Sequence, residues 1–332
     1  MAASPSNPTG VAARAARGAA LLAACRPRQW PKNLLVAVPM LAGHAAGDGT
    51  RWLAVALAAA AFSAVASVVY LVNDLLDADA DRLHPTKRER PIASGRLRPG
   101  VAKAAVPGLL LLAAALTAAL FLVDPPVAAA PGATAPSPAG FAATLLGYAT
   151  LAFAYSLRLK REPIVDVACL SGFYLARLLA GGFVVGLFPS PWLLGFAGAV
   201  FLTLALGKRY AELLTLFGSA VREHSPGTSA EAVPGRGWQP SDAPLVLAMG
   251  VASAWSAGVV LTLYLSSDAV RALYAHPRRL AIVVGLVLFG LNRLWFLAHR
   301  GRIHGDPLTF LVRDPVTWAL GAATLAAAWA AR

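Results

Sequence analysis

The feature of this sequence that most constrains its fold is a series of long apolar runs that contain few or no charged residues. A helix of about 20 apolar residues is long enough to cross the hydrocarbon core of a bilayer. Inside that core a chain has to satisfy its own backbone hydrogen bonds, which helices do. Of the 332 residues, 58% are hydrophobic and 14% are charged, and this balance excludes an ordinary soluble domain. The sequence therefore predicts an all-α integral membrane protein.

Turns and charges between the runs divide the chain into about nine predicted spans. They cover residues 33–48, 52–75, 102–123, 140–158, 164–187, 191–207, 244–266, 279–298 and 314–331. The first span is short and contains Pro39, and the basic and aromatic residues 26–33 before it favour an interfacial helix or a re-entrant start. Residues 1–25 are predicted to be a disordered cytoplasmic tail, and residues 26–332 a transmembrane catalytic domain.

The distribution of Lys and Arg predicts which ends of the spans face the cytoplasm. The N-terminal segment and the connections after the second, fourth, sixth and eighth spans, counted with the adjoining span ends, contain 23 of these residues, and the opposite connections, counted in the same way, contain four. Because basic loops stay in the cytoplasm, we expect a multi-pass protein of the cell membrane with a cytoplasmic N-terminus and an external C-terminus. The net charge of +13 follows from this pattern, so no nucleic-acid partner is expected. Residues 218–243 lack periodicity and are predicted to form a cytoplasmic loop, either a linker or a lid.

Acidic residues are concentrated at the end of the second span. Asn73, Asp77 and Asp81 follow one another at intervals of four, and Asp74 lies three residues before Asp77. If the helix continues, these side chains share one face. Carboxylates this close repel one another unless cations compensate, and oxygen ligands suit Mg²⁺. The pattern predicts a magnesium site with these four residues as ligands, and the alternative is a solvated acidic helix end.

A basic loop that contains proline and ends in glycine, residues 82–95, follows the acidic residues directly. Bases beside a cation-binding set of acids are expected to bind a metal pyrophosphate, and membrane anchoring is the alternative for each base taken alone. The predicted phosphate-binding residues of this loop are Arg82, Lys87, Arg88 and Arg90.

This combination resembles the UbiA superfamily of membrane prenyltransferases, whose first motif has the form N-D-x-x-D-x-x-x-D followed by a basic loop. Residues 155–166 are similar to its second motif through Tyr155, Lys160 and Asp166. Many prenyltransferases of the superfamily have a second acid four residues later, where this sequence has Leu170. The resemblance therefore implies Mg²⁺ at the first motif and leaves Lys160 and Asp166 facing a phosphate.

Three further segments, residues 26–33, 155–182 and 207–213, narrow the resemblance. They are similar to the branch of the superfamily that transfers phosphoribosyl from phosphoribosyl pyrophosphate to decaprenyl phosphate. The resemblance covers most of residues 26–213 and implies a UbiA-like bundle around a cytoplasm-facing cavity, with a role in cell-envelope biogenesis. The remaining residues expected to bind substrate or phosphate are Arg28, Lys32, Asn33, Tyr155, Arg177, Lys208, Arg209 and Glu212. Membrane anchoring is the alternative for Arg28, Lys32, Asn33, Lys208 and Arg209, and a structural ion pair is the alternative for Arg177.

The expected reaction is attack by the phosphate of a membrane-embedded polyprenyl phosphate on carbon one of the ribose, with pyrophosphate as the leaving group. The expected catalytic residues are Asp74, Asp77, Asp81, Lys160 and Asp166. The nearest alternative is a conventional UbiA prenyltransferase, which moves a prenyl group from a prenyl diphosphate to an aromatic or lipid acceptor, and Leu170 argues against it. A transporter is a more distant alternative. Polar residues at mid-membrane depth would favour a transporter, whereas the acids of this sequence are concentrated at one end of a span. Asp306 and Asp314 are expected to cap helix starts, with closure of the cytoplasmic cavity as the alternative.

Overall fold

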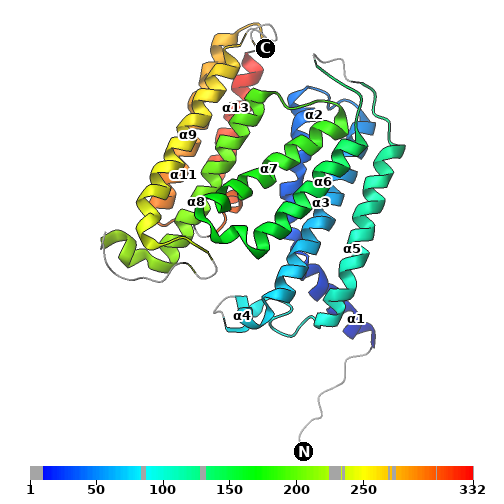
Figure 1. The fold of residues 1–332 in the computed structure, drawn as a ribbon. Helices are drawn as coiled ribbons and strands as arrows, with labels where there is room; N and C mark the ends of the chain where they lie inside the picture. The colour runs from blue at the N-terminus through cyan, green and yellow to red at the C-terminus, as the bar shows by residue number, and fades with distance from the viewer. Residues whose placement is uncertain are drawn as a thin grey trace, which may run out of the picture. The chain divides into compact units, whose positions relative to one another are not determined.

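The computed structural model describes residues 10–83, 87–127, 132–223, 233, 236–267, 270, 274–303 and 305–331. These residues form helices and turns without a β-strand (Figure 1), which confirms the predicted all-α fold. The chain divides into two compact units. Unit 1 contains Met1–Ser156 and Ala176–Phe188, and unit 2 contains Leu157–Leu175 and Pro189–Arg332.

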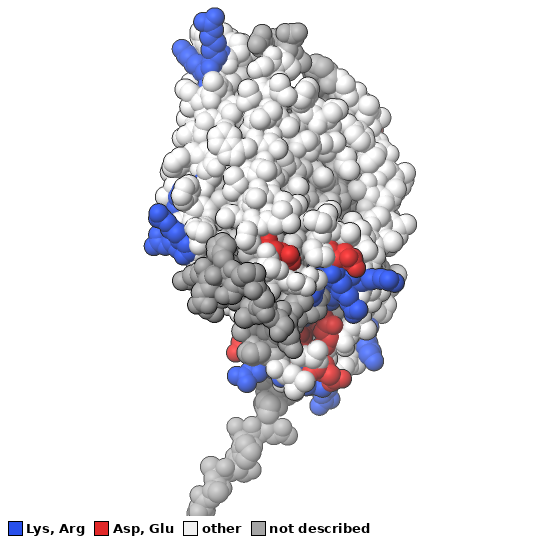
Figure 2. Space-filling view, turned by 60° about the vertical axis from the view of Figure 1, so that its left-hand side comes forward, with Lys and Arg blue, Asp and Glu red and all other residues white. Residues whose placement is uncertain are grey.

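In the described part of the chain, seven helical stretches are long and apolar enough to cross a membrane. They are α3 (Gly49–Leu76), α5 (Pro99–Ala119) with the turn Leu120–Leu122, α6 (Pro138–Leu157), α7 (Pro163–Val185), Pro191–Gly218 of α8 (Pro191–Glu223), α9 (Ala243–Leu265) with the turn Pro240–Asp242, and α11 (Leu280–His299) with the turn Pro277–Arg279. They coincide with seven of the nine predicted spans. Figure 2 shows a broad surface that is neither acidic nor basic, as expected where helices meet lipid.

The first and last predicted spans are not among these seven stretches, so the count of nine is not confirmed. The first consists of the 3-10 helix η1 (Pro27–Ala37) and the five-residue helix α2 (Val38–Ala42). Pro31 and Pro39 lack the N–H group that a continuous helix would use. The segment nevertheless runs along α3, because Arg26 contacts Asp74 near the end of that helix and the carbonyl oxygen of Ala45 accepts a hydrogen bond from Arg51 near its start. The last, α13 (Pro315–Ala330), has 16 residues, fewer than the roughly 20 that a crossing needs.

The prediction of a disordered tail is wrong for residues 10–24, which form helix α1 (Gly10–Ala24). Alanine favours a helix, but an isolated helix of this length is marginal without packing. The end of α1 supplies that packing, since Ala24 and Cys25 are buried in an apolar cluster with Leu71 and Leu97. Residues 1–9 of the predicted tail lie outside the described residues.

Helices α8, α9 and α11 of unit 2 pack around a buried chain of hydrogen bonds. Trp295 donates to the hydroxyl of Thr203 (2.8 Å), which donates to the carbonyl oxygen of Gly250 (2.6 Å). A Cβ at position 250 would overlap the Trp295 ring, so glycine is required for this close approach. Polar groups among membrane helices are satisfied internally here, as the surrounding hydrocarbon demands.

Two aspartates cap helix starts in unit 2, as predicted. Asp306 accepts a hydrogen bond from the backbone of Leu308 (3.1 Å) at the start of α12 (Pro307–Arg313). Asp314 accepts one from the backbone of Thr317 (2.8 Å) at the start of α13. Asp314 also forms a two-point ion pair with Arg293 (2.6 and 3.0 Å).

Candidate active site

The acidic motif of unit 1 lies where one helix ends and the next begins. Helix α3 ends just before Asp77, which has non-helical backbone angles (φ −92°, ψ 4°), and α4 (Ala78–Leu83) follows. Backbone hydrogen bonds still cross the break, from Asp77 to Asn73 (2.9 Å) and from Asp81 to Asp77 (2.8 Å). The predicted ligands therefore do not share one continuous helix face: Asp74 and Asp81 are buried, and Asp77 is half-buried.

Two arginines join the buried acids. Arg26 Nη2 donates to Asp74 Oδ1 (2.7 Å), and Arg90 Nη1 reaches both Asp74 Oδ1 (3.3 Å) and Asp81 Oδ2 (2.7 Å). Arg90 was predicted to belong to the site, whereas Arg26 was missed. Its backbone is in the left-handed region (φ 54°), which is uncommon for a residue other than glycine. The guanidinium of Arg26 also lies 4.7 Å from the ring centre of Tyr70, so its side chain is fixed on two sides.

The second carboxylate oxygen of Asp74, Oδ2, is buried and accepts no hydrogen bond from the described residues. A buried oxygen without a partner is costly, and a cation would satisfy it. The amide nitrogen of Asn73 donates to Ser156 of α6 (2.9 Å), which fixes that neighbouring side chain. Among the described residues no three His, Cys, Asp or Glu side chains gather into a preassembled metal site. The donors nevertheless fit Mg²⁺, which is commonly held by one or two carboxylates together with substrate phosphates.

The basic loop divides between the acids and the surface. Arg82 is exposed and pairs with the exposed Asp79. Lys87 is half-buried and Arg88 is exposed. Residues 84–86 of the loop lie outside the described residues. The structure brings Arg90, one of the four predicted bases, onto the buried acids.

Two predicted residues that are far apart in the sequence, Asn33 and Arg177, meet in unit 1. Arg177 Nε donates to Asn33 Oδ1 (2.8 Å), and Arg177 Nη2 donates to the Tyr148 hydroxyl (3.2 Å). The guanidinium lies 4.9 Å and 5.6 Å from the ring centres of Tyr148 and Phe62. Asn33 in turn donates to Ser63 (2.8 Å). An arginine in a membrane helix needs such polar and aromatic neighbours.

The structure places five other predicted residues at helix ends or short turns. On η1, Arg28 is exposed and Lys32 is half-buried. Tyr155 is half-buried near the end of α6, Lys160 is half-buried in the turn Leu159–Arg161, and Lys208 is half-buried in α8.

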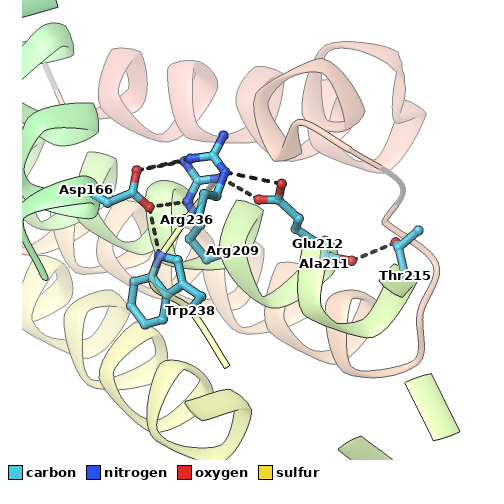
Figure 3. Close-up of polar contacts among 7 residues, drawn as sticks. All are labelled: Asp166, Arg209, Ala211, Glu212, Thr215, Arg236 and Trp238. Carbon is cyan, nitrogen blue, oxygen red and sulfur yellow. Dashed lines mark hydrogen bonds and ion pairs between the residues drawn. The ribbon is translucent and has the colours of Figure 1, made fainter. Parts of the chain in front are cut away.

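In unit 2, Asp166 lies in the first turn of α7 with a side chain that is 0% exposed. Its Oδ2 accepts hydrogen bonds from Arg209 Nε and from Trp238 Nε1 (2.8 Å), and its Oδ1 accepts from Arg209 Nη2 (3.0 Å) and Arg236 Nη1 (3.3 Å). Figure 3 shows Asp166 and Glu212 on opposite sides of the two arginines. Arg209 pairs with both acids, and Arg236 Nε lies 3.4 Å from Glu212 Oε1.

The predicted residues Asp166, Arg209 and Glu212 are thus brought together, but differently from expectation. Asp166 was expected to face a phosphate, and instead its oxygens are surrounded by protein donors. Sequence reasoning missed Arg236 and Trp238, because they lie in the predicted loop 218–243, which has no periodic pattern. Residues 224–232 and 234–235 of that loop lie outside the described residues.

Helices long and apolar enough to cross a membrane, with buried acid–arginine clusters at their ends, define an integral membrane protein. Residues 34–213, more than half of the chain, match the UbiA prenyltransferase family. The chain therefore belongs to the UbiA prenyltransferase family, which confirms the resemblance drawn from its two motifs.

Three relatives illustrate the range of similarity. The chain is 35% identical over 302 residues to Uncharacterized protein y4nM of Sinorhizobium fredii, covering 91% of this chain and 54% of that protein. It is 39% identical over 196 residues to the decaprenyl-phosphate phosphoribosyltransferase of Corynebacterium glutamicum, covering 58% and 54%. It is 31% identical over 297 residues to the Nodulation protein NoeC of Azorhizobium caulinodans, covering 88% and 86%. The chain thus spans about half the length of the first two relatives.

A solved structure supports the fold. A UbiA homolog from Archaeoglobus fulgidus, bound to DMAPP and Mg²⁺, superposes with a TM-score of 0.62 at 17% identity, covering 94% of this chain and 98% of that one. At this level of identity the likeness shows a common fold.

Proposed function

We propose that the chain transfers a 5-phosphoribosyl group from phosphoribosyl pyrophosphate to a polyprenyl phosphate, such as decaprenyl phosphate, and releases pyrophosphate. The observation that carries the proposal is the second motif. Leu170 stands where a second acid would be, and Asp166 is enclosed by arginine and tryptophan donors. A donor site built on two acidic pairs would need open carboxylates there. The 39% identity to a decaprenyl-phosphate phosphoribosyltransferase supports transfer of a phosphoribosyl group to such a lipid phosphate.

In this reaction an ionised phosphate oxygen of the lipid forms a bond to carbon one of the ribose. The bond from that carbon to the pyrophosphate oxygen breaks, and its electron pair leaves with pyrophosphate. No proton has to be removed from the attacking phosphate, so the protein needs no general base. Its task is to hold two anionic substrates together and to stabilise the charge on the leaving group.

The residues of unit 1 divide this task. Mg²⁺ would be held by the first motif, and when bound it would neutralise the pyrophosphate and improve it as a leaving group. Its protein ligands would be Asn73, Asp74, Asp77 and Asp81. Arg90 now bridges two buried acids and is 27% exposed. With a cation on those acids, its guanidinium would be available to the phosphate oxygens.

The lipid phosphate would be positioned by η1. Arg28 and Lys32 flank Trp30 on this short helix, and tryptophan favours the interface between lipid and water. We place the N-terminus and the active site in the cytoplasm and the C-terminus outside, in the cell membrane, with a role in building the cell envelope. The excess of bases in the cytoplasmic set of connections supports this orientation.

The test is a transfer assay with the purified protein in detergent, Mg²⁺, polyprenyl phosphate and radiolabelled phosphoribosyl pyrophosphate. We expect label in the lipid fraction from the wild type and from Asp79→Asn, whose side chain is 95% exposed, but not from Asp77→Ala. A matched reaction with prenyl diphosphate and an aromatic acceptor runs beside it. Turnover of the prenyl diphosphate without transfer of the sugar would refute the proposal and assign a conventional prenyltransferase activity.

A further inference from the structure

The segment that carries Arg236 is built tightly onto the start of α7. The backbone of Val233 donates to the carbonyl oxygen of Trp238 (2.8 Å), and that of Arg236 donates to the carbonyl oxygen of Val233 (2.9 Å). Both Val233 and Trp238 are buried. A Cβ at Gly237 would overlap the carbonyl oxygen of Arg161, so the two backbones are in direct contact. Arg236 is therefore positioned by its neighbours on both sides.

The two arginines of this cluster differ in how deeply they are buried. Arg209 is 1% exposed, and its Nε, Nη1 and Nη2 all donate to Asp166 or Glu212. Arg236 is 22% exposed, and it lies 3.3 Å from Asp166 and 3.4 Å from Glu212. These two contacts of Arg236 are longer than the hydrogen bonds from Arg209 to Asp166, and part of the Arg236 side chain is accessible.

Removing Arg236 from these contacts would leave neither acid without a partner. Asp166 would keep its two-point pair with Arg209 and the hydrogen bond from Trp238. Glu212 would keep Arg209. A buried acid that loses every partner is expensive, and that cost does not arise here. Arg236 can consequently turn toward a ligand while the buried part of the cluster stays intact.

We propose that Arg236 forms an anion subsite in unit 2 that binds a phosphoryl group. The planar guanidinium suits two-point contact with phosphate oxygens. This inference rests on the proposed function in one respect, that both proposed substrates carry phosphoryl groups. The position lies beyond residues 34–213, which match the family. The phosphoryl group comes either from a soluble pyrophosphate or from the lipid phosphate, and both sources share this chemistry.

The experiment measures binding to the full chain in detergent by titration calorimetry, with two separate probes: magnesium pyrophosphate, and polyprenyl phosphate in micelles. The variants are Arg236→Gln and Arg236→Lys. Arg302→Gln is the matched control, because it removes the charge of an exposed arginine in the same unit. We expect Arg236→Gln to weaken one probe by about tenfold or more, Arg236→Lys to weaken it less, and the control to bind like the wild type.

The two arms identify the source. Weaker binding of pyrophosphate alone assigns the subsite to the soluble donor, and weaker binding of polyprenyl phosphate alone assigns it to the lipid. Unchanged binding of both probes to a folded Arg236→Gln or Arg236→Lys protein would overturn the proposal and leave Arg236 a structural residue. Because pyrophosphate is released by phosphoribosyl and prenyl transfer alike, a failure of the proposed function in the transfer assay leaves this result interpretable.

Discussion

Two buried aspartates, Asp74 in unit 1 and Asp166 in unit 2, have almost the same exposure and opposite environments. Asp74 is 1% exposed, its Oδ1 meets Arg26 and Arg90, and its Oδ2 has no hydrogen-bond partner among the described residues. Asp166 is 0% exposed, and both of its oxygens accept hydrogen bonds. Burial of an acid in this protein therefore does not by itself indicate a ligand site.

The difference lies in the partners. The arginines of Asp74 are about a third exposed, at 31% and 27%, so water and substrate can reach them. The main partner of Asp166, Arg209, is 1% exposed, and its positive charge neutralises the carboxylate through a two-point ion pair. We propose that the first cluster exchanges its partners for a cation and a phosphate. The second holds the start of α7 against α8 and the segment after it.

If the cluster of Asp166 is structural, breaking it should cause the largest loss of stability. Asp166→Ala leaves Arg209 buried without its main counter-charge, and such a change costs about 3–5 kcal/mol of the free energy of unfolding. Thermal unfolding in detergent measures the effect. Asp79→Ala, at an exposed position, should leave the melting temperature unchanged. Equal melting temperatures for both variants would contradict the comparison.

For Asp74→Asn we expect lost transfer activity without a large loss of stability. This variant removes the charge that a cation needs but leaves Arg26 and Arg90 able to reach water, so the fold should persist. Transfer activity should fall on the order of a hundredfold or more, since cation assistance to the leaving group is worth several kcal/mol. Activity and melting temperature measured on the same preparation separate the two effects. If Asp74→Asn lowers the melting temperature as much as Asp166→Ala does, the Asp74 cluster is structural too, and the two clusters do not differ in role.

The sequence predicted the parts of the molecule that depend on local pattern. Span lengths follow from runs of apolar residues, and the acids after the second span stand close in the chain. Arg26 and Asp74, in contrast, are separated by 48 residues and Trp238 and Asp166 by 72, and no local pattern encodes such pairs. The shared face of Asn73, Asp77 and Asp81 depended on a helix that continues past the second span. The break at Asp77 could not be predicted, because residues that suit a helix lie on either side of it.

Gly237→Ala tests whether the segment after α8 closes the second cluster. The new methyl group would overlap the carbonyl oxygen of Arg161 and push the segment away from α7. Overpacking of this kind costs about 1–3 kcal/mol, less than the loss of Asp166. A lower melting temperature and a red-shifted fluorescence of Trp238, assigned with a Trp238→Phe variant as reference, are expected. Unchanged values in both measurements would mean that the segment does not press on α7.

Replacement of Asp314 is expected to have the smallest effect on stability. It tests whether an ion pair that is not deeply buried contributes to the free energy of unfolding. The hydrogen bonds from Arg293 hold the pKa of this carboxyl below its ordinary value, with a further contribution from Thr317. A lowered pKa in the folded state stabilises the fold above the ordinary pKa of about 4, and this stabilisation is lost as the pH falls through the lowered value. Asp314→Ala should therefore cost about 1 kcal/mol at neutral pH, mainly through the lost helix cap. The difference in melting temperature from the wild type should shrink below pH 4, and a gap that widens on acidification would exclude this role for the ionised carboxylate.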